Sequence, residues 1–168
     1  MRFLLIDRIV ELKPGSKARG FRLLRPGADY YLDHMPGYPI EPGALILESM
    51  AQLGGRLVQR SVEVASGDEV LPMLASVSGA EFKRPVRPGE RLDLTAEVLA
   101  IRSVGARVRT SAAVGGLEVA TATLTYVLAG PSNNVMGIGP DELDRIREWG
   151  RRTWLELTKE PATPGDLA

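Results

Sequence analysis

The only histidine of the chain, His34, lies in a stretch rich in proline and glycine that precedes an apolar segment with a single acidic residue, Glu48. The stretch over 34–43 reads His-Met-Pro-Gly-Tyr-Pro-Ile-Glu-Pro-Gly. Its prolines fix φ, and its glycines permit tight turns. The pattern therefore predicts a stiff loop that carries a titratable imidazole, followed by an element that carries a carboxylate.

The segment after this loop is predicted to be a helix that opens at Pro42-Gly43 and runs to about Arg60, with apolar residues on nearly all of its faces. A helix that is apolar all round is buried. Its length is marginal for a membrane span, and Glu48, Gln52 and the Gly54-Gly55 pair argue against one. We therefore expect the helix at the centre of a soluble domain.

That setting suggests two chemical roles. Burial disfavours the charged form of a carboxylate, so Glu48 is suited to act as a general acid near neutral pH. The free amides around Gly43 at the helix start can bind a carbonyl oxygen that is gaining negative charge. The structural alternatives are a loop histidine bonded to a backbone carbonyl, a helix glutamate that faces solvent, and a glycine that only forms a turn.

Composition narrows the function classes. The 168 residues suffice for one domain with a substantial core, and 21 basic and 21 acidic residues give zero net charge, which argues against generic nucleic-acid binding. The absence of cysteine excludes disulfides and thiolate metal sites, and a single histidine excludes a histidine-rich metal site. Residues 1–8 meet charge too early for a signal peptide, so we expect a cytoplasmic protein without a membrane span.

Apolar runs and alternating patterns predict strands on both sides of the helix. They cover 3–12 and 18–24 before it, and 70–77, 80–86, 92–103, 106–114 and 117–128 after it. Gly115-Gly116 is a hairpin signal between the last two strands, and the polar residues 61–69 indicate a connection. Because a sheet needs one face covered, we predict an α+β fold in which a curved antiparallel sheet wraps one long central helix.

This body is predicted to cover residues 1–130, and 131–168 to form a linker, a C-terminal amphipathic helix and a tail. The C-terminal helix is expected over 141–159. Its apolar stripe includes Trp149 and Trp154, for which we expect packing on the body or on another subunit.

The loop and helix resemble the signature of the 3-hydroxyacyl-[acyl-carrier-protein] dehydratases of bacterial fatty-acid synthesis, which have the hot-dog fold. The shared pattern is His34-Met35-Pro36-Gly37, Pro39, Pro42-Gly43, Leu45, Glu48 and Ala51-Gln52. Two further blocks, at 3–8 and 80–90, resemble the same family. With glutamate at position 48 the chain resembles the branch of the family that only dehydrates. The branch that also isomerises the double bond carries aspartate at this position.

The resemblance implies elimination of water from a 3-hydroxyacyl thioester on acyl carrier protein, which gives a trans-2-enoyl thioester. His34 would remove the C2 proton, Glu48 would supply or position the proton for the departing hydroxide, and the Gly43 amide would stabilise the enolate-like charge. The family suggests Phe82 at the wall of an apolar acyl tunnel and needs no metal or redox cofactor. It forms homodimers, or assemblies of dimers, in which the histidine of one chain lies opposite the glutamate of the other.

Other functions remain open at this point. A thioesterase or a CoA-dependent hydratase would use the same fold, and a non-catalytic acyl-binding subunit would keep it without turnover. Asp33 and Met35 favour that last alternative somewhat, because they replace the family's usual glycine and phenylalanine. The basic residues of the second block form either a solvated strand face or a docking patch for an acidic carrier protein. These residues are Lys83, Arg84 and Arg87.

Overall fold

The computed structural model describes residues 3–130, 137 and 139–158. Its strands are β1 (Arg8–Lys13), β2 (Lys17–Leu23), β3 (Leu71–Phe82), β4 (Arg91–Arg102), β5 (Gly105–Val114) and β6 (Leu117–Ala129). Its helices are the 3-10 turn η1 (Asp29–Tyr31), α1 (Gly43–Ser66) and α2 (Pro140–Thr158). The strands form one antiparallel sheet in the order β1-β2-β4-β5-β6-β3.

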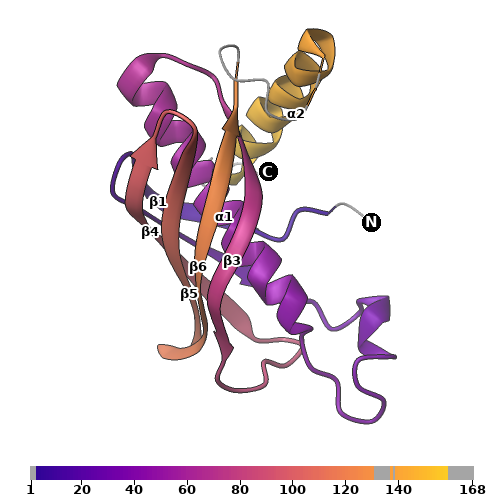
Figure 1. The fold of residues 1–168 in the computed structure, drawn as a ribbon. Helices are drawn as coiled ribbons and strands as arrows, with labels where there is room; N and C mark the ends of the chain where they lie inside the picture. The colour runs from indigo at the N-terminus through magenta and orange to yellow at the C-terminus, as the bar shows by residue number, and fades with distance from the viewer. Residues whose placement is uncertain (1–2, 131–136, 138, 159–168) are drawn as a thin grey trace, which may run out of the picture.

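The sheet curves around α1, as predicted, while η1 and the loop after it lie beyond the N-terminal end of that helix (Figure 1). Alternation along the strands explains how the sheet covers the helix. On β5 the side chains of Ala106 and Val108 are buried, whereas Arg107 and Arg109 between and after them are exposed. The apolar side chains of this strand therefore face the helix and its arginines face away from it.

The helix and the sheet approach each other most closely at Gly54, where an added Cβ would lie 2.6 Å from the hydroxyl oxygen of Tyr126. Tyr126 is buried on β6 and donates its hydroxyl proton to the carbonyl of Ala51 at 2.7 Å. Burial, and then the charge of Glu48, raises the pKa of Tyr126, so the phenol stays a neutral donor. The glycine in the middle of the helix is therefore explained by packing against the sheet.

The central helix is longer than the sequence indicated. It ends at Gly67, which has a left-handed φ of 79° and donates its amide to the carbonyl of Glu63 at 2.9 Å. The predicted connection over 61–69 is therefore wrong for residues 61–66. Polarity misled the prediction, because the buried Ser61 bonds within the helix, to the carbonyl of Leu57 at 2.6 Å.

The same helix is not buried on all sides within one chain, as had been predicted from its apolar residues. Ala44 is exposed, and Leu45, Leu47 and Glu48 are only half-buried. The first turns of α1 therefore keep an open face that the sheet does not cover.

The two strands predicted over 70–77 and 80–86 form the single strand β3, which ends at Phe82, so the prediction is wrong for residues 83–86. Between Ser78 and Glu81 its register with β6 shifts, and Gly79 there has a φ of 58°. A bulge of this kind bends a strand without ending it, which is why the sequence pattern looked interrupted.

The first strand begins at Arg8 and not at residue 3 as predicted. The preceding segment is held by side-chain contacts instead, since the amide of Leu5 donates to the side-chain oxygen of Gln52 at 2.9 Å.

Among the residues that the structure describes, neither of the two α-helices has the length and the apolar character that a membrane span needs.

The C-terminal helix forms as predicted but packs with only part of its expected stripe. Leu157 is buried and Trp154 packs against the core, whereas Trp149 is 56% exposed. The linker expected over 131–139 lies largely, and the tail over 161–168 wholly, outside the described residues.

Candidate active site

His34 lies in a loop that closes on itself. The amide of His34 donates to the carbonyl of Tyr30 at 2.9 Å, and the amide of Ile40 donates to the carbonyl of His34 at 3.2 Å. The ring nitrogen Nδ1 lies 3.2 Å from the carbonyl oxygen of Ile40. Because a carbonyl only accepts, Nδ1 carries the proton of the neutral ring, and Nε2 keeps a lone pair that can accept a proton.

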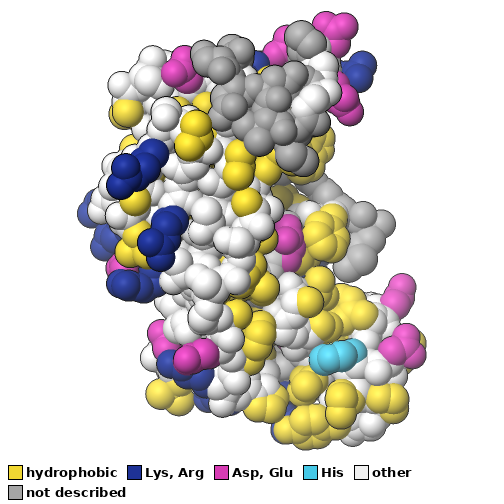
Figure 2. Space-filling view, in the orientation of Figure 1, with side chains coloured by type: hydrophobic (Ala, Val, Ile, Leu, Met, Phe, Trp, Pro, Cys, Tyr) yellow, Lys and Arg dark blue, Asp and Glu magenta, His cyan; other side chains and the backbone are white. Residues whose placement is uncertain are grey.

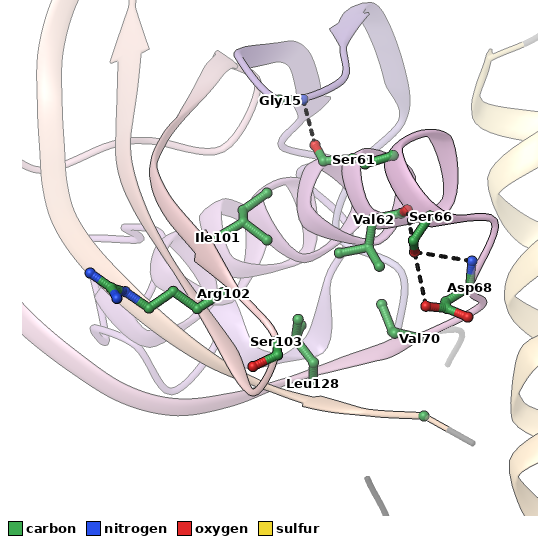
Figure 3. A pocket seen from close by; sticks show the side chains of 12 residues that line it. Gly15, Ser61, Val62, Ser66, Asp68, Val70, Ile101, Arg102, Ser103 and Leu128 are labelled. Atoms are coloured by element: carbon green, nitrogen blue, oxygen red, sulfur yellow. Dashed lines mark hydrogen bonds between the residues drawn. The ribbon is translucent and has the colours of Figure 1, made fainter. Parts of the chain in front are cut away.

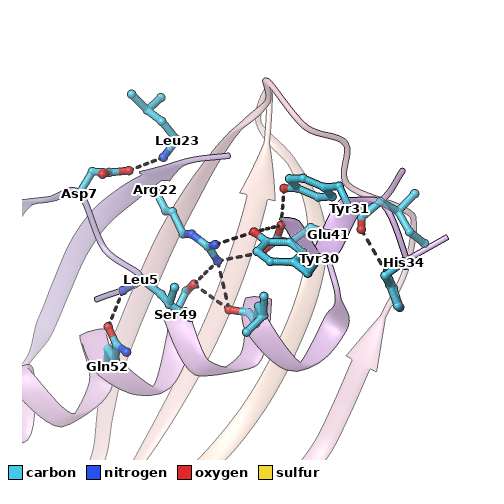
Figure 4. A network of polar contacts seen from close by, with 12 residues as sticks. Leu5, Asp7, Arg22, Leu23, Tyr30, Tyr31, His34, Glu41, Ser49 and Gln52 are labelled. Carbon is cyan, nitrogen blue, oxygen red and sulfur yellow. Dashed lines mark hydrogen bonds and ion pairs between the residues drawn. The ribbon is translucent and has the colours of Figure 1, made fainter. Parts of the chain in front are cut away.

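A buried polar network anchors this loop (Figure 4). The carboxylate of Glu41, which follows Ile40, is fully buried and lies 2.8 Å from Nη1 of Arg22. The hydroxyls of Tyr30, at 3.0 Å, and Tyr31 both donate to the second carboxylate oxygen of Glu41. Burial is the largest cause that raises the pKa of both tyrosines, so they remain protonated donors.

The same arginine ties the network to the central helix. Nη1 of Arg22 donates to Oγ of Ser49 at 3.2 Å, and Nη2 donates to the hydroxyl of Tyr30 at 3.2 Å. Sequence reasoning missed this network. A signal existed, because Arg22 follows Ala18 and Gly20 at the alternate positions that face the core.

Gly43 and Phe82, both predicted to bind substrate, lie next to each other. A Cβ at Gly43 would lie 3.1 Å from the ring of Phe82, which is 50% exposed. The amides of Leu45 and Ile46 both donate to the carbonyl of Pro42, at 2.9 and 3.1 Å. The amide of Gly43, which precedes these bonds, therefore has no acceptor inside α1. Gly43 lies beside the ring of Phe82.

Glu48 lies further along α1 and is half-buried within one chain. Nε2 of Gln52 donates to Oε1 of Glu48 at 3.0 Å. Gln52 is itself fixed, because its oxygen accepts the amide of Leu5 at 2.9 Å and its nitrogen donates to the carbonyl of Phe3 at 3.3 Å. The carboxylate is thus oriented by a glutamine that the N-terminal segment holds in place.

Within the described part of the chain, the structure does not bring His34 and Glu48 together by a hydrogen bond or an ion pair. The partner of the imidazole is Ile40, and the partner of the carboxylate is Gln52. The histidine, cyan in Figure 2, lies at the surface beside hydrophobic side chains. The His34 loop runs into the start of α1, where Gly43 lies beside Phe82, and Glu48 lies further along that helix. We refer to these two places as the two half-sites.

The three basic residues after Phe82 are exposed and make local contacts. Lys83 pairs with Glu118, and this hydrogen bond is the main cause that raises the pKa of Lys83. Nη2 of Arg84 donates to the carbonyl of Val114 at 2.8 Å. The guanidinium of Arg87 lies 4.7 Å from the ring centroid of Tyr38, in the histidine loop, and donates to its hydroxyl at 2.8 Å.

A cavity of about 570 Å³ lies at the opposite end of α1 (Figure 3). Its lining includes Val62, Val70 and Leu128, and none of the residues predicted for the site contributes to it. The cavity is therefore separate from the two half-sites.

Comparison with known proteins agrees with the motif. A family model described as a FabA-like domain matches residues 1–123. The 3-hydroxyacyl-[acyl-carrier-protein] dehydratase FabZ of Thermus thermophilus is 43% identical over 134 residues, which cover 77% of this chain and 89% of that protein. The protein of the same name from Syntrophotalea carbinolica is 39% identical over 127 residues, which cover 76% and 85%.

Solved structures share the fold at much lower identity. The protein smu.793 of Streptococcus mutans, bound to acetyl CoA, gives a TM-score of 0.58 at 18% identity and covers 73% of this chain and 88% of its own. The dehydratase heterocomplex ApeI:P of Xenorhabdus doucetiae gives 0.60 at 16% identity, with 86% and 89% covered. The chain therefore has the hot-dog fold and belongs to the FabA-like family.

Proposed function

We propose that this chain dehydrates 3-hydroxyacyl thioesters carried on acyl carrier protein to trans-2-enoyl thioesters, at sites that two copies of the chain share. The observation that carries the activity is the 43% identity to a 3-hydroxyacyl-[acyl-carrier-protein] dehydratase over 89% of that protein's length. The order and spacing of His34, Gly43 and Glu48 support the assignment of roles.

The half-site geometry supports a simple elimination. Nε2 of His34 takes the C2 proton, and the electron pair of that bond forms the C2–C3 double bond. The amide of Gly43 donates to the thioester oxygen, which gains negative charge in the transition state. The C3–O bond breaks as Glu48 protonates the leaving hydroxide to water. Proton exchange with solvent then restores the neutral imidazole and the protonated carboxyl group.

The shared site is supported by the position of β3. This strand of 12 residues lies at one edge of the sheet and is mostly exposed, and open edges of this length favour pairing. Antiparallel pairing of two copies of β3 places the Phe82 end of one strand beside the Leu71 end of the other. Glu48 lines a hollow with Leu71 and Leu74, so the partner's loop and helix start would approach this carboxylate.

Steady-state assays with three thioester classes test the activity. With 3-hydroxyacyl thioesters on acyl carrier protein we expect enoyl product without release of free thiol. With saturated acyl thioesters we expect no reaction, because no hydroxyl can leave. Hydrolysis of the saturated thioesters would identify a thioesterase instead, and binding without turnover of any class would identify an acyl-binding subunit.

A further inference from the structure

A hollow of about 230 Å³ opens between α1, β3 and α2, and the proposed acid lies on its wall. Most of the large apolar residues around it come from β3 and from the C-terminal helix. They include Leu71, Leu74, Ile146, Trp149 and Trp154. The helix that follows the matched family domain thus contributes directly to the surroundings of Glu48.

The guanidinium groups and the glutamines of the same hollow each have a protein partner, although Nε of Arg56 and Nε of Arg147 are buried without one among the residues that the structure describes. Nη1 of Arg56 donates to Gln59 at 3.1 Å, and Nη1 of Arg147 lies 3.1 Å from Asp144. Gln52 is held between Glu48 and the N-terminal segment. Among the residues that line the hollow, Glu48 therefore remains the group with reaction chemistry.

The two tryptophans differ in how they meet the hollow. Trp154 is half-buried, and the guanidinium of Arg56 lies 5.9 Å from its ring centroid. Trp149 is 56% exposed although it was expected to pack. Large aromatic side chains at the mouth of a concave site supply apolar contact area for a ligand, and Trp149 is placed to do so.

The chemistry of the substrate identifies the occupant. If Glu48 protonates the hydroxyl leaving C3, the acyl chain beyond C3 begins beside this carboxylate. The adjacent space is the hollow, whose volume is below the roughly 300–1,000 Å³ of sites that enclose whole small ligands. It therefore suits one part of a chain and not an entire long acyl group.

We propose that Trp149 and Trp154 on α2 form a wall of the acyl-binding site and make the enzyme favour longer acyl chains. This proposal rests on the proposed role of Glu48. Trp149 contacts the part of the chain that follows C4, and Trp154 closes the hollow behind it. A four-carbon substrate ends before it reaches this wall.

The first test compares kcat/KM for a four-carbon and a long-chain 3-hydroxyacyl thioester. Trp149→Ala is expected to lower the long-to-short ratio about tenfold, as loss of an apolar contact does, and to affect the long-chain substrate far more than the four-carbon one. Leu155→Ala is the matched control, since Leu155 is 59% exposed on the same helix but does not line the hollow. Trp149→Phe should retain most of the preference.

A second test uses fluorescence, because the chain has two tryptophans and both line the hollow. Saturated long-chain acyl thioesters, which cannot react, are expected to shift tryptophan emission saturably in the Glu48→Gln protein. Acetyl thioesters are not expected to shift the emission, because their acyl chain is too short to reach the tryptophans.

Three outcomes would overturn the proposal. They are an unchanged long-to-short ratio in Trp149→Ala, an equal loss for both lengths, and loss of the dimer in that variant, which would assign Trp149 to subunit packing. None of them affects the proposed dehydration. That function would fail separately, if the wild-type protein did not turn over 3-hydroxyacyl thioesters.

Discussion

The carbonyl of Ile40 decides which nitrogen of His34 is free to act as a base. Because it lies 3.2 Å from Nδ1, the proton of the neutral ring belongs there, and Nε2 is the nitrogen that can accept a proton. The contact that a purely structural histidine would make is thus present, yet it orients the ring and leaves its second nitrogen available.

His34→Ala should lower kcat for dehydration by at least ~10²–10⁴-fold, the range typical for loss of a general base. The side chain is half-exposed in a loop, so Tm should stay close to that of the wild type. Enoyl absorbance measures the rate, and circular dichroism measures the melting. Near-native turnover would remove His34 from the mechanism.

Glu48→Gln keeps the shape of the side chain and an oxygen for the bond from Gln52, but it cannot deliver a proton. We expect turnover to collapse while Tm stays the same or rises, because a partly buried carboxylate is replaced by a neutral amide. The same two measurements apply. A fully active Glu48→Gln protein would show that this carboxylate is structural.

At the scale of the elements, the periodicity of apolar residues predicted the central helix and the strands. It could do so because this periodicity depends only on residues that are neighbours in the sequence. It failed where a distant contact decides the outcome. Ser61 continues the helix although it is polar, since its hydroxyl bonds to the carbonyl of Leu57 and accepts the amide of Gly15. Gly79 bends β3 instead of ending it because the pairing with β6 resumes at Glu81.

The motif predicted the site residues, but it could not reveal what holds them. Arg22 on β2 and Glu41 at the end of the histidine loop belong to different elements and meet in the fold, where Arg22 also bonds to Ser49 of α1. Likewise, the position of Trp149 beside Glu48 depends on how α2 folds back on the body. The local pattern can place Arg22 on the core-facing side of its strand, but it cannot name the residue that Arg22 meets there.

Glu41→Gln should strongly destabilise the fold, because Glu41 is the buried partner of Arg22 in the polar network that anchors the histidine loop. Removing one partner of a buried ion pair costs about 3–5 kcal/mol, because the cation of Arg22 stays buried without its counter-charge. Glu118→Gln, in the exposed pair with Lys83, is the matched control and should change little. Urea unfolding compares the two, and equal losses would mean that the buried pair does not stabilise the loop.

The basic residues that follow β3, which are Lys83, Arg84 and Arg87, offer a test of carrier docking. Lys83→Glu with Arg84→Glu should raise the apparent KM for substrate on the acidic carrier, because complementary charge raises the encounter rate. A short diffusible thioester should be little affected. Lys13→Glu on β1, at the other edge of the sheet, is the control. Equal effects on both substrates would reject docking here.

At the scale of the whole molecule, the proposed mechanism requires two copies of the chain for each site. Gly43 and Phe82 lie together at the start of α1, after the loop in which Ile40 holds His34, whereas Glu48 lines the hollow beside α2 and the first residues of β3. Pairing of β3 with the same strand of a second copy about a two-fold axis would bring unlike half-sites together and create two equivalent sites.

Complementation between two inactive proteins tests this arrangement. His34→Ala and Glu48→Gln proteins are mixed, unfolded and refolded together. In each mixed dimer one site receives both lesions and the other receives none, and random pairing makes about half of the dimers mixed, so roughly a quarter of wild-type activity should return by symmetry. Sites built within one chain would return no activity, because every site would carry one lesion. Native mass spectrometry verifies that mixed dimers formed. Their presence without activity would refute the shared site, while each variant refolded alone is the baseline.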